Sequence, residues 1–155
     1  MVFGRSTISE LTAPSSLDEG KDLPKTDLKR RIVIVDDDKT ILETLGFILS
    51  EHPQLQCETI LFSGGNPAIE FFEKHPDLRI DLVLCDVRMP DGDGVTFLKR
   101  FRRIYPKTSF YLMTGYMDIT FEKAVDQGAQ GVLHKPFNPF KTVSELLKLN
   151  LKLGA

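Results

Sequence analysis

The sequence has little of what marks several large protein classes. Of its 155 residues only two are cysteines, Cys57 and Cys85, and both lie in apolar stretches, which predicts small buried side chains and not a disulfide or a reactive thiol. No apolar run approaches the roughly 20 residues that a membrane-spanning helix needs. The N-terminus lacks the apolar segment of a signal peptide. We therefore expect a cytoplasmic protein without a membrane span.

The charge and composition narrow the possible functions further. The net charge is −2, and because no stripe of basic residues stands out, direct binding of nucleic acid is not expected. Hydrophobic residues make up 41% and charged residues 27% of the chain, which is typical of one globular domain with a real core. The three histidines, His52, His75 and His134, lack the spacing of metal ligands and are expected at the surface or its boundary.

The chain divides into a polar start and a regular remainder. Residues 1–29 are rich in Ser, Thr, Pro and charged residues, which predicts a flexible N-terminal tail. A single domain is expected over residues 30–153. Because the chain stops soon after the last predicted helix, we expect no attached output domain.

Short apolar runs alternate with stretches of helical periodicity throughout the predicted domain. The expected strands are 31–35, 56–62, 82–85, 109–113 and 131–134, and the expected helices are 40–50, 67–74, 95–104, 119–126 and 139–151. This alternation predicts an α/β fold, a flavodoxin-like (βα)5 doubly wound sandwich. Its five-stranded parallel sheet should have the order 2-1-3-4-5.

Polar residues follow four of the predicted strands at the point where each strand ends. Asp36 and Asp37 follow the first strand, Asp86 ends the third, Thr114 ends the fourth and Lys135 ends the fifth. In the predicted order these strands are contiguous, so the side chains should meet at one edge of the sheet. Clustered carboxylates suit Mg²⁺, and with a hydroxyl and an ammonium they are the parts needed for phosphoryl transfer to an aspartate.

Four stretches, in this order and at suitable spacing, make the chain resemble the receiver domain of two-component response regulators. They are Ile32-Val-Ile-Val-Asp-Asp-Asp38, Leu82-Val-Leu-Cys-Asp-Val-Arg-Met-Pro-Asp-Gly-Asp-Gly94, Met113-Thr-Gly115 and His134-Lys-Pro-Phe137. The resemblance covers about residues 30–152. It implies a phosphorylated signalling module that is not an enzyme. With no output domain expected, it would be a stand-alone, chemotaxis-regulator-like receiver.

The resemblance also assigns roles to the residues at the strand ends. It implies that Asp86 is the phosphoacceptor and that Asp36 and Asp37 hold Mg²⁺ with it, the backbone carbonyl of Arg88 being a further ligand. A histidine kinase or a histidine phosphotransfer protein would donate the phosphoryl group. The signal would leave through protein contact or onward transfer in a phosphorelay.

The remaining implied roles lie on the fourth and fifth strands. The resemblance implies that Thr114 and Lys135 bind the phosphoryl oxygens and that the bond between Lys135 and Pro136 is cis, which is uncommon even before proline. Val132 stands where such domains commonly carry an aromatic residue that couples the site to the output face. Val132 therefore leaves two expectations: switching through Thr114 and loop movement alone, or weak switching.

Two further positions tune the lifetime of the phosphoryl group in this family. They lie two residues after the phosphoacceptor and two after the threonine, and here they are Arg88 and Tyr116. Both side chains are large enough to crowd the attacking water. We therefore predict slow self-dephosphorylation.

The last predicted helix carries more leucines than one buried face can take. Together with Ile119 and Phe121 of the fourth helix, they predict a partly apolar surface formed by the fourth helix, the fifth strand and the fifth helix. Such a surface would bind a downstream protein or a second copy of the chain. A frayed or covered C-terminus explains the leucines equally well.

Other readings of the acidic cluster fit less well. An aspartyl phosphatase of the haloacid dehalogenase type needs an acid two residues after its nucleophile, where this chain has Arg88. A nucleotide site after the first strand would be repelled by three aspartates, of which Asp38 is best explained as a helix N-cap. The stronger alternative is a degenerate receiver that acts as a docking module without phosphorylation, mildly favoured by Val132.

Overall fold

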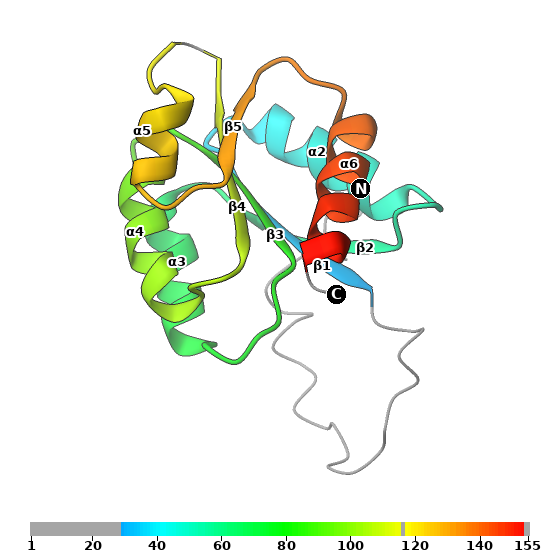
Figure 1. The fold of residues 1–155 in the computed structure, drawn as a ribbon, viewed down its shortest axis with the longest axis horizontal. Coiled ribbons are helices and arrows are strands. Elements are labelled where there is room, and N and C mark those ends of the chain that lie inside the picture. The colour runs from blue at the N-terminus through cyan, green and yellow to red at the C-terminus, as the bar shows by residue number, and fades with distance from the viewer. Residues whose placement is uncertain (1–28, 116, 154–155) are drawn as a thin grey trace.

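The computed structural model describes residues 29–115 and 117–153, with the backbone alone described for 149–153. Strands and helices alternate along the chain (Figure 1). In order they are β1 (Arg30–Val35), α2 (Lys39–Glu51), β2 (Cys57–Phe62), α3 (Gly65–Lys74), β3 (Leu82–Asp86), α4 (Gly94–Ile104), β4 (Ser109–Thr114), α5 (Phe121–Asp126), β5 (Gly131–His134) and α6 (Pro139–Leu153). The sheet is parallel and has the order β2-β1-β3-β4-β5, so the predicted fold class is confirmed.

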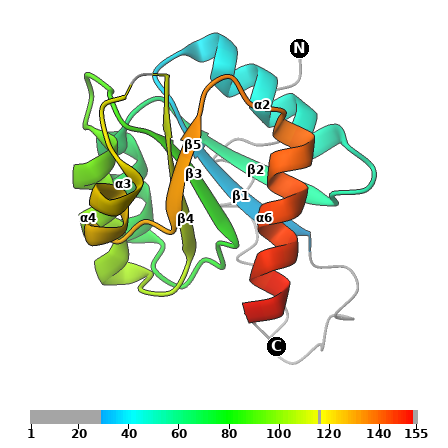
Figure 2. The same cartoon turned by 45° about the horizontal axis from the view of Figure 1, so that its top comes forward.

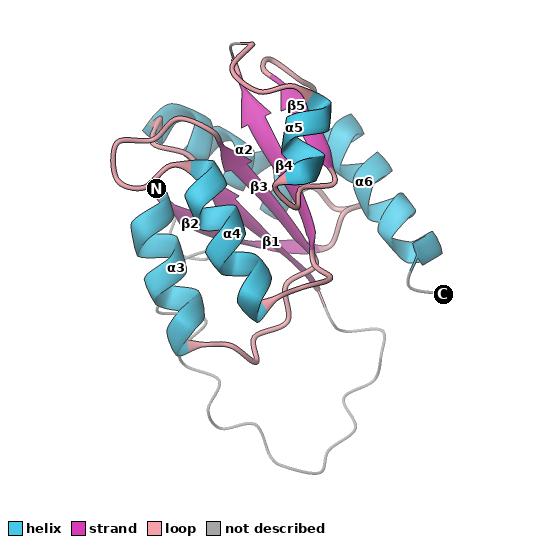
Figure 3. Ribbon diagram, turned by 60° about the vertical axis from the view of Figure 1, so that its left-hand side comes forward, coloured by secondary structure: helices cyan, strands magenta, loops and turns pink. Residues whose placement is uncertain are grey.

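Helices cover both faces of the sheet, which is why the central strands read as continuous apolar runs. Figure 3 shows α3, α4 and α5 on one side of the strands, and Figure 2 shows α2 and α6 together on the other. Successive side chains of β1 serve the two layers in turn: Val33 and Val35 pack toward α3 and α4, whereas Ile32 and Ile34 pack toward α2 and α6. The sheet is therefore packed on both faces, and this packing positions the ends of its strands.

Polar side chains cap helices just beyond the strand ends. The Asp38 carboxylate accepts hydrogen bonds from the backbone N–H groups of Thr40 and Ile41, which confirms the predicted N-cap of α2. Asp93 caps α4 and Thr120 caps α5 in the same way. A capped helix start fixes the chain direction after each loop, so these caps help hold the loops above the sheet.

The predicted cysteine and histidine environments agree with the structure. Cys57 and Cys85 are buried and unpaired. Burial raises the pKa of the Cys57 thiol to about 11 and that of Cys85 well above its ordinary value, so both behave as small apolar side chains. His52 and His75 are half-buried, and His134 is exposed.

The predicted boundaries of the strands and helices lie within two residues of the observed ones, and the starts of α3 and α5 show why they differ. α3 begins at Gly65, two residues before the predicted start at Pro67, because the N–H of Ala68 already donates a helical hydrogen bond to the carbonyl of Gly64. α5 begins at Phe121 and not at Ile119, because Thr120 is the N-cap. Ile119 is half-buried and packs against the core, so only part of its side chain is left to contribute to the predicted apolar surface.

The two ends of the chain leave some predictions open. The predicted tail lies outside the described residues except for Lys29, and the domain bounds 30–153 stay a prediction. Within α6, Val143, Leu146 and Leu147 are buried, whereas the side chains of Leu149, Leu151 and Leu153 lie outside the described part. Among the helices of residues 29–115 and 117–153, none combines the length and apolar character that a membrane crossing requires.

Candidate functional site

The four strand-end positions predicted from the sequence meet at one edge of the sheet. β1 and β3 are in register at Val35 and Cys85, so the aspartates that follow each of these residues lie side by side. β4 and β5 are in register at Thr114 and His134, which brings Lys135 next to them. The structure therefore brings together the predicted groups from β1, β3, β4 and β5.

Three carboxylates form the centre of this site. Asp36, Asp37 and Asp86 each offer an oxygen within 4.8 Å of the others. Asp36 is buried, Asp86 is half-buried and Asp37 is exposed, so the cluster opens to solvent on one side. Three carboxylate oxygens at this spacing fit a hard cation such as Mg²⁺.

Lys135 supplies the positive charge in the cluster. Its Nζ lies 2.6 Å from Asp36 Oδ2 and 3.3 Å from Asp86 Oδ1. The Lys135–Pro136 peptide bond is cis, as the resemblance implied. The Lys135 backbone N–H donates to the carbonyl of Thr114 at 2.8 Å, so β4 itself fixes where the lysine leaves the sheet.

The protonation of the site follows from burial and charge. Burial and, after it, the charge of the Asp36 carboxylate raise the pKa of Asp86 to about 6, against the opposing effect of Lys135. Burial alone would lower the pKa of Lys135, but its hydrogen bond to Asp36 and the two carboxylate charges outweigh burial and raise it. Ionisation of Asp86 is thus disfavoured in the metal-free site, and a bound cation would favour it.

Thr114 lies at the end of β4, and Arg88 lies in the loop after the neighbouring strand β3. The Thr114 side chain is buried, and its hydroxyl lies 3.5 Å from Asp118 Oδ2. Arg88 follows β3, and its largely exposed side chain donates from Nη2 to Asp118 Oδ1 at 2.5 Å. Sequence reasoning missed Asp118, because its partner Arg88 is 30 residues away in the sequence and no motif marks it.

A second missed feature supports the loop that follows Asp86. The turn before α3 packs against the loop before α4: the N–H of Gly65 donates to Gly92 O at 2.9 Å, and that of Asn66 donates to Asp91 O at 3.0 Å. The Asn66 amide also donates to Asp91 Oδ1. Gly92 has φ of +92°, a conformation that favours glycine. Turn residues in the two segments signalled each turn, but nothing in them signalled that the turns contact each other.

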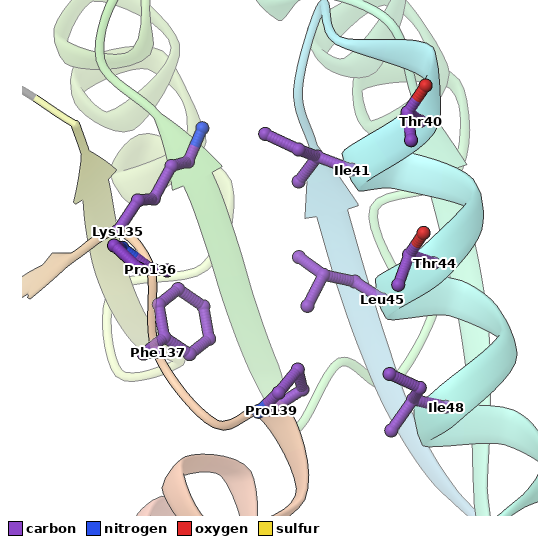
Figure 4. Close-up of a pocket in the computed structure, with 9 residues that line it drawn as sticks. All are labelled: Thr40, Ile41, Thr44, Leu45, Ile48, Lys135, Pro136, Phe137 and Pro139. Atoms are coloured by element: carbon purple, nitrogen blue, oxygen red, sulfur yellow. The ribbon is translucent and has the colours of Figure 1, made fainter.

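An apolar groove opens beside the acidic cluster. It has a volume of about 350 Å³ and lies between α2 and the segment from Lys135 to Pro139. Figure 4 shows Ile41, Leu45 and Ile48 pointing from α2 toward Phe137. Lys135 lies at the edge of this groove, so a molecule seated in it would be next to the carboxylates.

The remaining predicted residues are placed as follows. Val132 is half-buried in β5 and packs against the core, so no aromatic side chain occupies that position. Tyr116 lies outside the described residues. Phe121 and Val125 of α5 and Met117 of the preceding loop are exposed large apolar side chains. They give the face formed by α5, β5 and α6 part of its expected apolar character.

Comparison with known families identifies the family to which this fold belongs. A family model described as the response regulator receiver domain matches residues 32–147. The chain belongs to the response-regulator receiver family of two-component signalling. Receiver domains are signalling modules that generally bind Mg²⁺ at an acidic pocket and receive phosphoryl groups from histidine kinases or phosphotransfer proteins.

Individual relatives agree with this assignment. The chain is 36% identical to the regulatory protein AtoC of Escherichia coli over 110 residues, which is 70% of this chain and 22% of AtoC. A CheY-like receiver domain from Methanospirillum hungatei superposes with a TM-score of 0.67 at 27% identity, covering 81% of this chain and 98% of that one. The beryllofluoride-activated NtrC4 receiver domain dimer superposes with a TM-score of 0.65 at 27% identity, covering 77% of this chain and 98% of that one. This chain thus spans less than a quarter of the length of AtoC.

Proposed function

We propose that this receiver carries a phosphoryl group on Asp86 in a Mg²⁺-dependent reaction. The observation that carries the proposal is the position of the Lys135 ammonium between Asp36 and Asp86, with Asp37 completing a carboxylate triad. A lysine that only stabilises the fold needs one carboxylate partner, whereas Lys135 contacts two. Three clustered carboxylates with one ammonium leave net negative charge, which disfavours the cluster unless a cation binds there.

Each residue has a distinct role in the proposed transfer. A carboxylate oxygen of Asp86 attacks the phosphorus of a phosphohistidine, the phosphorus–nitrogen bond breaks, and its electron pair stays on the imidazole. Lys135 and Thr114 bind oxygens of the phosphoryl group. Lys135 binds through its positive charge, and the Thr114 hydroxyl donates a hydrogen bond. Asp36, Asp37, Asp86 and the Arg88 carbonyl would hold Mg²⁺, which when bound neutralises charge on the phosphoryl oxygens.

The proposal extends to partners. The groove beside Lys135 offers a phosphodonor protein an apolar surface next to Asp86, and Phe121 and Val125 offer a second surface for a downstream protein or a second receiver. One structural relative is described as a receiver domain dimer. We propose that the signal leaves through this second surface, in the cytoplasm.

The test is incubation with Mg²⁺ and a small phosphoryl donor, followed by intact mass spectrometry. The wild-type protein should gain the mass of one phosphate, and Asp86→Asn should gain none. Asp38→Asn removes the same charge from a helix cap outside the cluster and should behave as the wild type. A wild-type protein that gains nothing would support the alternative, a docking module that acts without phosphorylation.

Two further predictions from the sequence belong to this proposal. The bulk of Arg88 and Tyr116 favours slow self-dephosphorylation, and loss of the phosphate within seconds would contradict it. The expectation that the receiver acts without an attached output domain stays a prediction, which the mass of the protein in its native cells would test. The proposal treats the chain as a phosphoacceptor and not as an enzyme.

A further inference from the structure

Asp118 links the two loops that flank the phosphoacceptor. It lies four residues after Thr114, and its two carboxylate oxygens have different partners. Oδ1 accepts from the Arg88 guanidinium at 2.5 Å, and Oδ2 faces the Thr114 hydroxyl at 3.5 Å. Because Arg88 lies two residues after Asp86, one carboxylate joins the loop that carries the acceptor to the loop that follows the proposed switch threonine.

The two contacts differ in strength. The Asp118 side chain is 12% exposed, so its ion pair with Arg88 is sheltered at the carboxylate end, and a charge-assisted hydrogen bond at this distance is strong. The contact with Thr114 is longer than the usual 2.5–3.0 Å of an O–H···O hydrogen bond. Of the two contacts that Asp118 makes, the one with Arg88 is thus the stronger and provides the firm attachment of the loop.

The geometry points to Asp118 as a positioning residue that holds the Thr114 hydroxyl and the Arg88 guanidinium while Asp86 is unphosphorylated, and that gives up both donors to the phosphoryl group. This inference rests on the proposed phosphorylation of Asp86. A phosphoryl group carries three strong acceptor oxygens and about −1.5 to −2 charge, so it competes for both donors with a carboxylate that carries one charge. When the Thr114 hydroxyl and the Arg88 guanidinium bind the phosphoryl group in place of Asp118, the loop after β4 loses its attachment to the loop after β3.

The consequence is a measurable cost of activation. The free energy by which Asp118 stabilises the unphosphorylated state must be given up on activation. The equilibrium is therefore shifted away from the phosphorylated state by the same amount. Removing the Asp118 charge should therefore ease activation. Removing Arg88 should reduce that gain, because Asp118 then lacks its firm attachment.

The test is titration of the full chain with beryllofluoride, a phosphoryl analogue, at fixed Mg²⁺, followed by amide chemical shifts. Asp118→Asn should bind beryllofluoride about 5-fold to 20-fold more tightly than the wild type, within the usual range of coupling between sites. Asp118→Glu, which keeps the charge, should stay within about 2-fold. Asp126→Asn removes an exposed carboxylate from α5 and should leave the affinity unchanged.

A double-mutant cycle separates positioning from simple removal of negative charge. In the Arg88→Gln background, Asp118→Asn should change the affinity by less than half as much as in the wild type, because contacting residues are not additive. Amide hydrogen exchange within residues 115–120 should become faster in metal-free Asp118→Asn and stay unchanged in Asp126→Asn. This second measurement needs no phosphoryl analogue.

The outcomes are distinct. Wild-type protein that binds no beryllofluoride overturns both the phosphorylation proposal and the role of Asp118. Wild-type binding with no gain in Asp118→Asn overturns the role of Asp118 alone. An equal gain in both backgrounds, with unchanged amide exchange, shows a long-range charge effect and also overturns it.

Discussion

The ammonium of Lys135 lies 2.6 Å from Oδ2 of Asp36, although 99 residues separate the two in the sequence. The Asp36 side chain is almost fully buried and that of Lys135 is 18% exposed, so the pair lies largely out of water. The same ammonium also reaches Asp86. In the metal-free protein this ammonium thus contacts two members of the acidic cluster directly, and it competes with Mg²⁺ for the same oxygens.

We therefore expect Lys135→Gln to have two opposite effects. Breaking a buried ion pair leaves Asp36 without its partner, so the free energy of unfolding of the metal-free protein at pH 7 should fall by about 3 kcal/mol. Mg²⁺ should bind more tightly, because it no longer competes with the ammonium. Urea unfolding in a chelator measures the first effect, and calorimetric titration measures the second. Lys141→Gln, an exposed lysine of α6, is the control, and equal stability of the two variants would contradict the prediction.

The stability of the metal-free protein should depend on pH through Asp86. Burial raises the pKa of this carboxyl to about 6, above its value of about 3.9 in an unfolded chain. Between these values the folded state binds more protons, so this group's contribution to the free energy of unfolding falls by up to about 3 kcal/mol as the pH rises from about 4 to 6.

The variant Asp86→Asn isolates that effect. It cannot ionise, so its stability relative to the wild type should increase between pH 4.5 and pH 7 in urea unfolding with a chelator present. Saturating Mg²⁺ should remove the difference in slope, because the cation favours the ionised form. A difference between the two proteins that stays constant with pH would show that the Asp86 pKa is not raised.

Binding of Mg²⁺ should depend on Asp37 and not on its neighbour Asp38. Asp37 belongs to the carboxylate triad, whereas Asp38 caps α2. At 100 times its dissociation constant, Mg²⁺ should stabilise the wild type by about 2.7 kcal/mol. Asp37→Asn should lose most of this gain in thermal unfolding. Asp38→Asn keeps the cap and should retain the gain; equal losses in both variants would place the cation elsewhere.

The sequence predicted those parts of the fold that follow from local pattern and topology. The apolar runs of β1 and β3 indicate buried strands. Ligands bind at the carboxyl ends of parallel strands, and from this rule the sequence analysis predicted that Asp36, Asp86 and Lys135 lie together. Contacts between loops were not predictable in this way. The pairing of Gly65 with Gly92 and of Arg88 with Asp118 joins segments far apart in the sequence, and neither partner's local sequence indicates the other. The observed start of α5 differs from the predicted one because the helix begins after its N-cap Thr120 and not at the first apolar residue of the pattern.

The glycine that starts α4 should be needed for the geometry of the phosphoacceptor strand. A Cβ added at Gly94 would lie 2.1 Å from the carbonyl oxygen of Asp86 and 3.2 Å from Cys85 Sγ, and backbone cannot move aside as a flexible side chain can. Gly94→Ala should therefore push the end of β3 away, lower the free energy of unfolding by about 1–3 kcal/mol and weaken Mg²⁺ binding.

Gly115→Ala is the matched control for this clash. It is the same substitution beside the same site, but a Cβ at Gly115 has no atom within 4 Å. Its free energy of unfolding should stay within about 0.5 kcal/mol of the wild type. Urea unfolding and Mg²⁺ titration of both variants decide the matter. If Gly94→Ala binds Mg²⁺ as the wild type does, the end of β3 tolerates displacement, and the close approach of α4 to Asp86 is not what positions its carboxylate.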